Sequence, residues 1–239
     1  PNLLKGAVMT ASRYATFTPA SLEFLRELRD NNNRDWFNEN KPRYEEQVLD
    51  VALQFIQSMQ EPLAGIAPHF TAVPKRVGGS LMRIYRDTRF SKIKTPYKTN
   101  IGIQFRHEQA RDVHAPGYYV HIDPDRVFLG AGMWRPAPDA LRGIRERIDA
   151  KPEVWRRARD DKGFKRHFQL GGETLTRPPR GFDKAHPEIA DIKRKDFIAV
   201  KDLALEDAIG PRFQQKVETA FRAATPYMTF LCKAVDVPF

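Results

Sequence analysis

The residues best suited to chemistry in this sequence lie between Leu81 and Thr99, in the run LMRIYRDTRFSKIKTPYKT. Its basic residues are Arg83, Arg86, Arg89, Lys92, Lys94 and Lys98. Arginine presents a planar fork of donors that suits phosphate or carboxylate, and lysine adds a compact positive charge. The stretch therefore predicts an anion-binding site, to which Tyr97 and Thr99 add hydroxyl donors.

The one acid of this basic stretch is Asp87, which stands between Arg86 and Arg89. We expect its carboxylate to be ionised and to orient an arginine. It is also a candidate catalytic residue, although the neighbouring cations lower its pKa and weaken it as a base. The structural alternative is a salt-bridged cluster that ties the loop to the sheet. The stretch lacks the glycine spacing of a phosphate-binding P-loop, and no dinucleotide fingerprint occurs elsewhere.

An alternating hydrophobic pattern predicts four strands, at about 81–87, 98–107, 117–123 and 126–134. Alternation would bury one face, made of Met82, Ile84, Ile101, Ile103, Phe105, Val120, Ile122, Val127, Leu129 and Met133. The other face would gather Arg83, Tyr85, Asp87, Gly102, Gln104, Tyr119, His121, Asp123, Phe128, Gly130, Gly132 and Trp134. Glycines inside strands often mark the close approach of a ligand. This second face therefore predicts a cleft, and the alternative is that helices cover it and that bulky side chains occupy the space at the glycines.

A histidine and a carboxylate, His121 and Asp123, fall on this second face two residues apart. Such a pair can relay a proton or contribute to a metal site. No third ligand follows at a diagnostic spacing, so we predict no metal and no cofactor. Asp123 also begins the turn Asp123-Pro124-Asp125-Arg126, which suits a hairpin. No serine lies in the glycine pattern of a nucleophile elbow.

Helical patterns precede and follow these strands. Thr18-Pro19 is typical of a helix start, and a long amphipathic helix is expected from Lys41-Pro42. Further helices are expected from Pro138, from Pro152 and at the C-terminal end, where Pro226 breaks or kinks the run. Residues 174–177 and 197–200 are expected to add short strands. The sequence therefore predicts an α+β fold: residues 17–239 form one domain around a mainly antiparallel sheet, and residues 1–16 are an extension.

Composition restricts the environment and the partners. The formal net charge of +10 favours anionic partners, either a small ligand or a nucleic acid. The single cysteine, Cys232, excludes an internal disulfide and a cysteine-based zinc site. No apolar run approaches the roughly 20 residues that cross a bilayer, so we expect no membrane association. A secretory signal is also absent from the first residues, and a cytoplasmic location is expected.

The central motif resembles that of a family of uncharacterised, mostly bacterial proteins, the conserved hypothetical family of domain of unknown function 2461. The likeness rests on Arg83-x-x-Arg86-Asp87-x-Arg89-Phe90, then Lys94-x-Pro96-Tyr97-Lys98-Thr99 and Gly102. The segments YYVHIDPDRVFLGAGMW, RPPRGFDKAHP and KRKDF are also similar to the family, and the likeness begins at about Phe17. The resemblance implies no reaction. It favours a shared site for the basic stretch and the glycine-containing strands.

Three functional hypotheses follow from these residues. In the first, Arg83, Arg86 and Lys98 hold the phosphate or carboxylate of a small ligand. Arg89 and Lys94 would assist them, and Tyr85, Tyr119 and Trp134 would line the rest of the cleft. The second is an enzyme in which His121 acts as general acid or base beside that anion. The third is a nucleic-acid binding module, whose affinity would fall steeply with salt.

Overall fold

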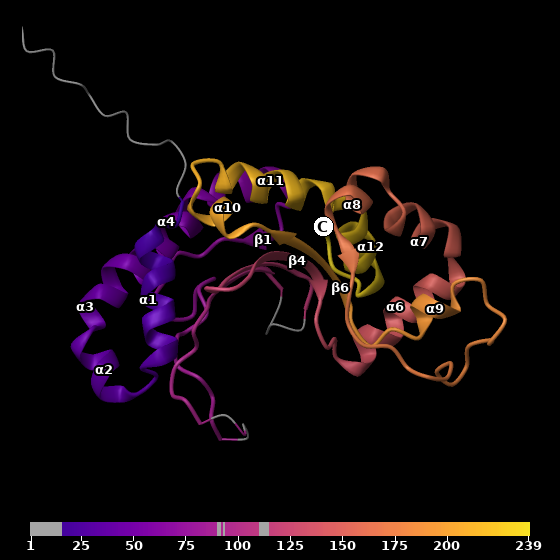
Figure 1. Cartoon of the computed structure of the whole chain (residues 1–239). Helices are drawn as coiled ribbons and strands as arrows, with labels where there is room; N and C mark the ends of the chain where they lie inside the picture. Colours follow the sequence, from indigo (N-terminus) through magenta and orange to yellow (C-terminus); the bar gives the residue numbers. More distant parts are fainter. Residues whose placement is uncertain (1–15, 90–91, 93, 110–114) are drawn as a thin grey trace, which may run out of the picture.

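The computed structural model describes residues 16–89, 92, 94–109 and 115–239, and it has an α+β fold (Figure 1). Each neighbouring pair of strands in its six-stranded sheet is antiparallel, in the order β1-β2-β3-β4-β6-β5. The strands are β1 (Phe70–Thr71), β2 (Ile101–His107), β3 (Gly117–Ile122), β4 (Val127–Met133), β5 (Gln169–Leu170) and β6 (Phe197–Leu203). The predicted fold class, a central antiparallel sheet with helices before and after it, is confirmed.

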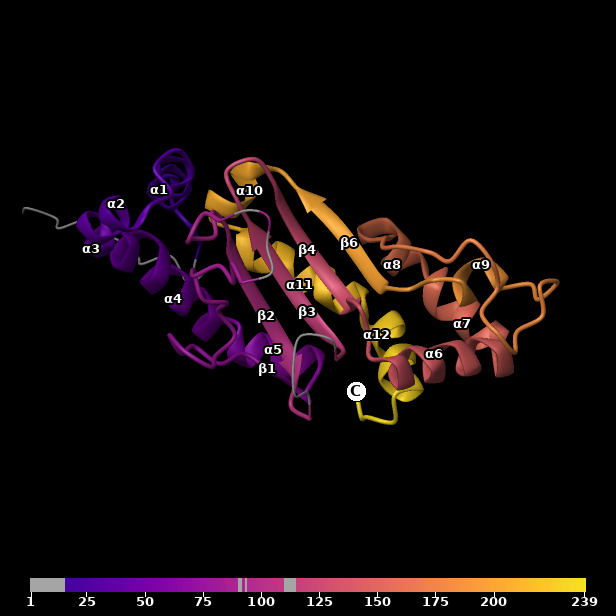
Figure 2. The same ribbon diagram turned by 90° about the horizontal axis from the view of Figure 1, so that it is seen from below.

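The helices before the sheet begin at one end of the molecule (Figure 1), and the last of them lies beside β1 (Figure 2). They are α1 (Pro19–Asp30), α2 (Arg34–Glu39), α3 (Lys41–Tyr44), a π-helical turn η1 (Glu45–Leu49), α4 (Asp50–Ser58) and α5 (Gln60–Ile66). Thr18 caps α1 through a capping box with Ser21, as its sequence predicts. Asn33 caps α2 by accepting a hydrogen bond from the Trp36 N–H. The single long helix expected from Lys41 is instead a series of shorter pieces, α3, η1, α4 and α5.

The helices after β4 lie at the other end and behind the sheet (Figures 1 and 2). They are α6 (Pro138–Ala150), α7 (Pro152–Arg159), α8 (Lys162–His167), α9 (Ile189–Ile192), α10 (Leu205–Ile209), α11 (Phe213–Ala223) and α12 (Thr225–Ala234). Prolines begin α6 and α7, and Pro226 lies in the first turn of α12, just after the break from α11. No helix among the described residues has the length and apolar character needed to span a bilayer.

Two strand predictions are wrong. Residues 81–87 form no strand and make only the isolated bridges Leu81–Ile103 and Tyr85–Tyr97. The reason is that this segment pairs with its own continuation, since the Arg86 N–H donates to Pro96 O and the Lys98 N–H to Ile84 O. Residues 174–177 likewise make only one bridge, from Thr174 to Arg194. The strand predicted at 197–200 is present and extends to Leu203.

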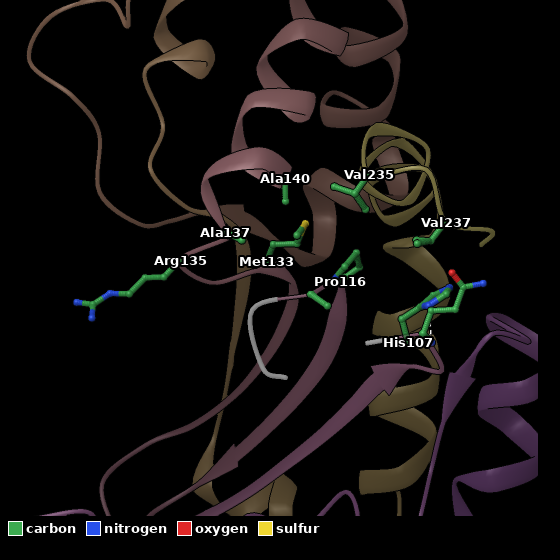
Figure 3. Close-up of a pocket in the computed structure, with 10 residues that line it drawn as sticks. His107, Pro116, Met133, Arg135, Ala137, Ala140, Val235 and Val237 are labelled. Atoms are coloured by element: carbon green, nitrogen blue, oxygen red, sulfur yellow. Dashed lines mark hydrogen bonds between the residues drawn. The ribbon is translucent and has the colours of Figure 1, made fainter. Parts of the chain in front are cut away.

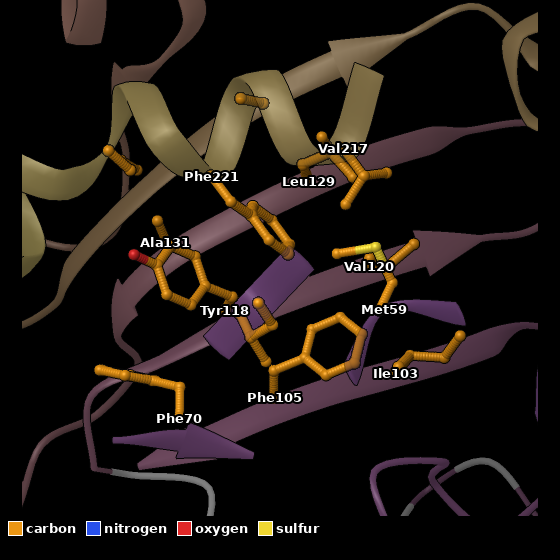
Figure 4. Packing of buried hydrophobic residues seen from close by; sticks show 14 of the residues in the cluster. Met59, Phe70, Ile103, Phe105, Tyr118, Val120, Leu129, Ala131, Val217 and Phe221 are labelled. Carbon is orange, nitrogen blue, oxygen red and sulfur yellow. The ribbon is translucent and has the colours of Figure 1, made fainter. Parts of the chain in front are cut away.

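One face of the sheet packs against the helices and forms the core (Figure 4). The Phe221 ring of α11 lies 4.5 Å from the Tyr118 ring and 6.0 Å from the Phe105 ring, centroid to centroid. The residues predicted for this face are buried, with one exception. Met82 is only partly buried and lines a cleft on the opposite face, because the segment that carries it is not a strand.

The other face of β2, β3, β4 and β6 is turned away from the helices, as the view from below shows (Figure 2). The alternative that helices cover this face is therefore wrong. Tyr119 and Phe128 both lie on this face, partly exposed. The antiparallel pairing sets Gly130 beside Tyr119 and Gly102 beside His121.

The close pairing of β4 with β6 predicts that Gly132 cannot be replaced. Gly132 has φ +123°, and a Cβ atom there would lie 2.0 Å from the Phe197 carbonyl oxygen. The backbone strain alone costs about 1–3 kcal/mol, and the clash adds to it. We expect Gly132→Ala to lower the free energy of unfolding by more than this, measured by urea denaturation.

The matched control is Gly65→Ala, on the exposed side of α5, where a Cβ atom would meet nothing within 4 Å. It should raise stability by about 0.5–1 kcal/mol, because alanine favours the helix over glycine. Equal unfolding free energies for the two variants would contradict the β4–β6 geometry.

Candidate functional site

A cleft of about 490 Å³ lies on the open face of the sheet, and we call it the sheet-face cleft. Most of its lining is apolar or aromatic, and the residues that line it with side chain or backbone are Met82, Gln104, Gly117, Tyr118, Tyr119, Arg126, Phe128, Gly130, Ala131, Gly132, Trp134, Ile198, Ala199 and Val200. Two of the predicted site residues, Tyr119 and Trp134, are among them. The cations of the basic stretch are not, so the cleft is less polar than the sequence predicts.

A second hollow, of about 510 Å³, lies between α2 and the basic stretch, and we call it the basic pocket. It is lined by Arg34, Asn38, Tyr85, Arg86, Thr88, Lys94, Pro96 and Tyr97. Four of these, Tyr85, Arg86, Lys94 and Tyr97, were predicted from the sequence. Arg34 and Asn38 were not, because they lie about fifty residues away in the sequence on a short helix with no motif of its own.

Tyr97 fixes the basic stretch against the N-terminal helices. Its ring stacks on the buried Phe37 ring, with centroids 4.0 Å apart. The Asn32 side chain forms two 3.1 Å hydrogen bonds with the Tyr97 backbone, donating to the carbonyl and accepting from the N–H. These contacts hold one wall of the basic pocket in place.

Three cations of the basic stretch lie within electrostatic range of one another. Burial is the main cause that lowers the pKa of Lys98, and the charges of Arg83 and Arg86 lower it further. Among the described residues, no carboxylate lies within ion-pair distance of Arg34, Arg83, Arg86, Lys94 or Lys98. The predicted salt-bridged cluster is therefore not seen around these residues.

Asp87 pairs instead with Arg89. Its carboxylate accepts hydrogen bonds from Arg89 Nε at 3.0 Å and from Nη2 at 2.8 Å. This side-chain pairing, together with the Arg89 N–H, lowers the pKa of Asp87 to about 2. The carboxylate is therefore a poor base at neutral pH. Thr99 and Arg83 line neither hollow, while Phe90, Ser91, Ile93, His114 and residues 1–15 lie outside the described residues.

His121 is the middle of a hydrogen-bonded chain. Its Nδ1 lies 3.1 Å from the Tyr119 hydroxyl oxygen, and its Nε2 lies 2.8 Å from Asp123 Oδ2. The ring also stacks on Phe128, with centroids 4.5 Å apart. The side chain is 17% exposed and is not part of the cleft lining. Both ring nitrogens are thus engaged within the protein, and Tyr119 is the end of the chain that reaches the cleft.

Asp123 holds the other end of this chain on the β3–β4 turn. Its Oδ1 accepts the N–H groups of Asp125 and Arg126 at 2.8 and 2.7 Å. Burial would raise the pKa of Asp123, but these bonds and the one from His121 outweigh it, so the pKa is below its usual value. The sequence offered two roles for this residue, turn former and partner of His121, and the geometry combines them.

Two glycines make room for the Tyr119 ring. A Cβ atom on Gly102 would lie 2.8 Å from the Tyr119 hydroxyl oxygen, and one on Gly130 would lie 3.3 Å from Tyr119 Cβ. From the sequence, such glycines could admit either a ligand or a bulky side chain. At these two positions the neighbour that they accommodate is Tyr119 itself.

A third hollow, of about 260 Å³, lies where β2 and β4 approach the C-terminal segment (Figure 3). Its walls are mainly apolar, from Pro116, Met133, Ala140, Val235 and Val237. His107 at its edge is held by Pro238, whose carbonyl lies 2.8 Å from Nε2. It contains none of the predicted site residues. Within the described ranges, no group of three or more histidine, cysteine or acidic residues is arranged to hold a metal ion.

The bonds to Asp123 predict an acid-sensitive contribution to stability. Its folded pKa is below the unfolded value of 3.8, so the contribution is complete above that value and is lost as the pH falls through the folded pKa. We expect Asp123→Asn to be less stable than the wild type at pH 6, and the difference to shrink below pH 4. Urea unfolding between pH 2.5 and 6 measures both.

Asp125→Asn is the control for this experiment, because Asp125 is exposed on the same turn and makes an ion pair with Arg29. Exposed ion pairs of this kind contribute little to stability. The free energy of unfolding of Asp125→Asn should therefore change with pH at low pH in the same way as that of the wild type. An Asp123→Asn difference that stays constant across this pH range would contradict the assigned bonds.

The comparisons with known proteins agree with the resemblance in the sequence. No curated protein matches the chain. Residues 20–230 match the model of a protein family described as conserved hypothetical protein (DUF2461). Because the match covers most of the 239 residues, the chain belongs to the DUF2461 family of conserved hypothetical proteins.

Proposed function

We propose that this protein binds a small ligand through a phosphate or carboxylate group in the basic pocket. Arg86 and Lys94 would contact the anion from the basic stretch, and Arg34 would contact it from α2. Lys98 and Arg83 would add positive potential from beside the pocket. The observation that carries the proposal is that Arg83, Arg86 and Lys98 lie close together with no ion pair to a carboxylate among the described residues, while burial and these two neighbouring charges lower the pKa of Lys98.

The physical argument is the cost of burying the Lys98 charge, to which the like charges of Arg83 and Arg86 add. Cations brought close to one another in a partly buried site disfavour their own charged forms unless an opposite charge is present. A folded protein usually supplies that charge as a carboxylate, as Asp87 does for Arg89. At Arg83, Arg86 and Lys98 a bound anion would supply it. Part of the cost of forming the cluster would then be recovered as binding free energy.

The choice of a small anion over a nucleic acid rests on the form of the site. The basic pocket is a hollow of about 510 Å³, which is in the range of small-molecule sites, roughly 300–1,000 Å³. Tyr85 is 54% exposed at its wall and would contact the uncharged part of the ligand. A nucleic-acid site stays a prediction, and salt dependence separates the two.

The proposal predicts that Arg86→Ala and Lys98→Met weaken anion binding. Hydrogen bonds to charged groups contribute about 1.5–3 kcal/mol, so we expect Arg86→Ala to raise the dissociation constant about tenfold or more, and Lys98→Met, which removes a nearby charge but no contact, to raise it by less. Isothermal titration calorimetry with pyrophosphate and with citrate measures this and separates phosphate from carboxylate preference. The control is Arg157→Ala, which removes an exposed cation of α7 and should leave both constants unchanged.

A second readout uses the apo protein. Since burial and the charges of Arg83 and Arg86 lower the pKa of Lys98, the charged lysine destabilises the fold at every pH below that pKa. Lys98→Met should therefore raise the melting temperature in anion-free buffer, and pyrophosphate should stabilise the wild type more than the variant. Equal binding by wild type, Arg86→Ala and Lys98→Met would overturn the proposal. Binding only to mixed-sequence single-stranded DNA, with a steep salt dependence, would favour the nucleic-acid alternative instead.

A further inference from the structure

The sheet-face cleft offers a second site, distinct from the basic pocket and independent of the function proposed for it. We propose that it binds a flat, largely apolar molecule that carries a hydroxyl group, and that this hydroxyl donates a hydrogen bond to the Tyr119 oxygen. The ligand class follows from three observations: the lining of the cleft, the direction of the hydrogen bonds around His121, and the space that Gly102 provides.

The lining of the cleft favours a ligand whose main part is uncharged and apolar. The large apolar residues of the lining include Phe128 on β4, Trp134 just after β4, and Ile198 and Val200 on β6. Trp134 is 48% exposed, which is unusual for so large an apolar side chain in this protein. The one cation in the lining, Arg126, is paired with Asp202 at 2.8 Å and lies over the Phe128 ring. An anionic ligand therefore gains less here than in the basic pocket.

The hydrogen bonds around His121 make the Tyr119 oxygen an acceptor. Asp123 is an ionised carboxylate that takes two backbone N–H groups on Oδ1, so Oδ2 accepts from His121 Nε2–H. In the neutral imidazole the other nitrogen, Nδ1, then has a lone pair and accepts from the Tyr119 hydroxyl. The Tyr119 proton is used in this bond. Its oxygen therefore presents only lone pairs to a ligand, which suits a hydroxyl donor.

Gly102 makes this arrangement possible. Its missing side chain leaves the space in which the Tyr119 hydroxyl reaches His121, since a Cβ atom would lie 2.8 Å from that oxygen. The same hydrogen-bond order, from a hydroxyl through histidine to a carboxylate, activates nucleophiles and general bases in enzymes. In this cleft it fixes where the ligand hydroxyl must lie.

The test compares two probes of nearly the same shape, 2-naphthol and 2-methoxynaphthalene, of which only the first has a hydroxyl donor. Equilibrium dialysis against the full chain gives both dissociation constants. A neutral hydrogen bond contributes about 0.5–1.5 kcal/mol, so we expect 2-naphthol to bind about threefold to tenfold more tightly. Tyr119→Phe should bind both probes equally, because it keeps the ring and removes the acceptor.

Two further variants keep the experiment falsifiable if Tyr119→Phe disturbs the fold. Val200→Phe fills the cleft from β6 and should abolish binding of both probes while leaving pyrophosphate binding unchanged. Gly102→Ala displaces the Tyr119 hydroxyl and should remove the preference for 2-naphthol. Three results would overturn the proposal: no binding of either probe, equal binding by the wild type, or a 2-naphthol preference that survives Tyr119→Phe.

Discussion

The packing of one face of the antiparallel sheet against α11 and α12 is the constraint on which the rest of the structure depends. Strict alternation along β2, β3 and β4 sends Phe105, Tyr118 and Val120 into this core. The same alternation forces their neighbours onto the opposite face, which the helices leave open. The open face therefore has to be occupied by side chains that tolerate water or by a ligand. Tyr119 and its hydrogen-bonded partners are one consequence.

The protein treats buried charge in two contrasting ways. Between α7 and α9, Arg159 donates to Glu188 at 2.5 Å and to Asp191 at 2.6 Å, and Trp155 donates to the same Asp191 oxygen at 2.8 Å. Arg194 completes this network at 2.7 Å. Such an arrangement satisfies each charge and joins the helices of this end. Among the described residues, Arg83, Arg86 and Lys98 make no such ion pair, and the Asp87 carboxylate, whose charge acts on Arg83, is bonded to Arg89. This difference within one protein favours a ligand over a structural role.

Much of the fold could be predicted because each element carries a local signal. Thr18-Pro19 and Pro152 mark helix starts, and the alternation in 117–133 marks β3 and β4. The segment 81–87 has a similar alternation but forms no strand. It pairs with β2 only at its start, where the Met82 N–H donates to Gly102 O, and from Ile84 onward its hydrogen bonds go to 96–98. Periodicity does not specify the partner of a segment, so this error could not be avoided from one sequence.

The residue types of the candidate site could be predicted from the sequence. Their separation into two hollows, the basic pocket and the sheet-face cleft, could not. The sequence indicated Arg86, Lys94 and Tyr97, and these do line one pocket. It also placed Tyr119 and Trp134 with them, whereas they line a separate cleft. Arg34 was missed because a contact between distant segments leaves no pattern in either. The role of Gly102 could not be predicted either, since it depends on where the Tyr119 hydroxyl lies.

The pKa of the Lys98 amino group, measured by NMR with and without pyrophosphate, tests the central claim most directly. A cation cluster that awaits an anion predicts a pKa below the ordinary lysine value of 10.5 in anion-free buffer. It also predicts that saturating pyrophosphate raises this pKa, because a bound anion favours the charged form. An ordinary pKa without ligand, or a lowered pKa that pyrophosphate leaves unchanged, would contradict the account.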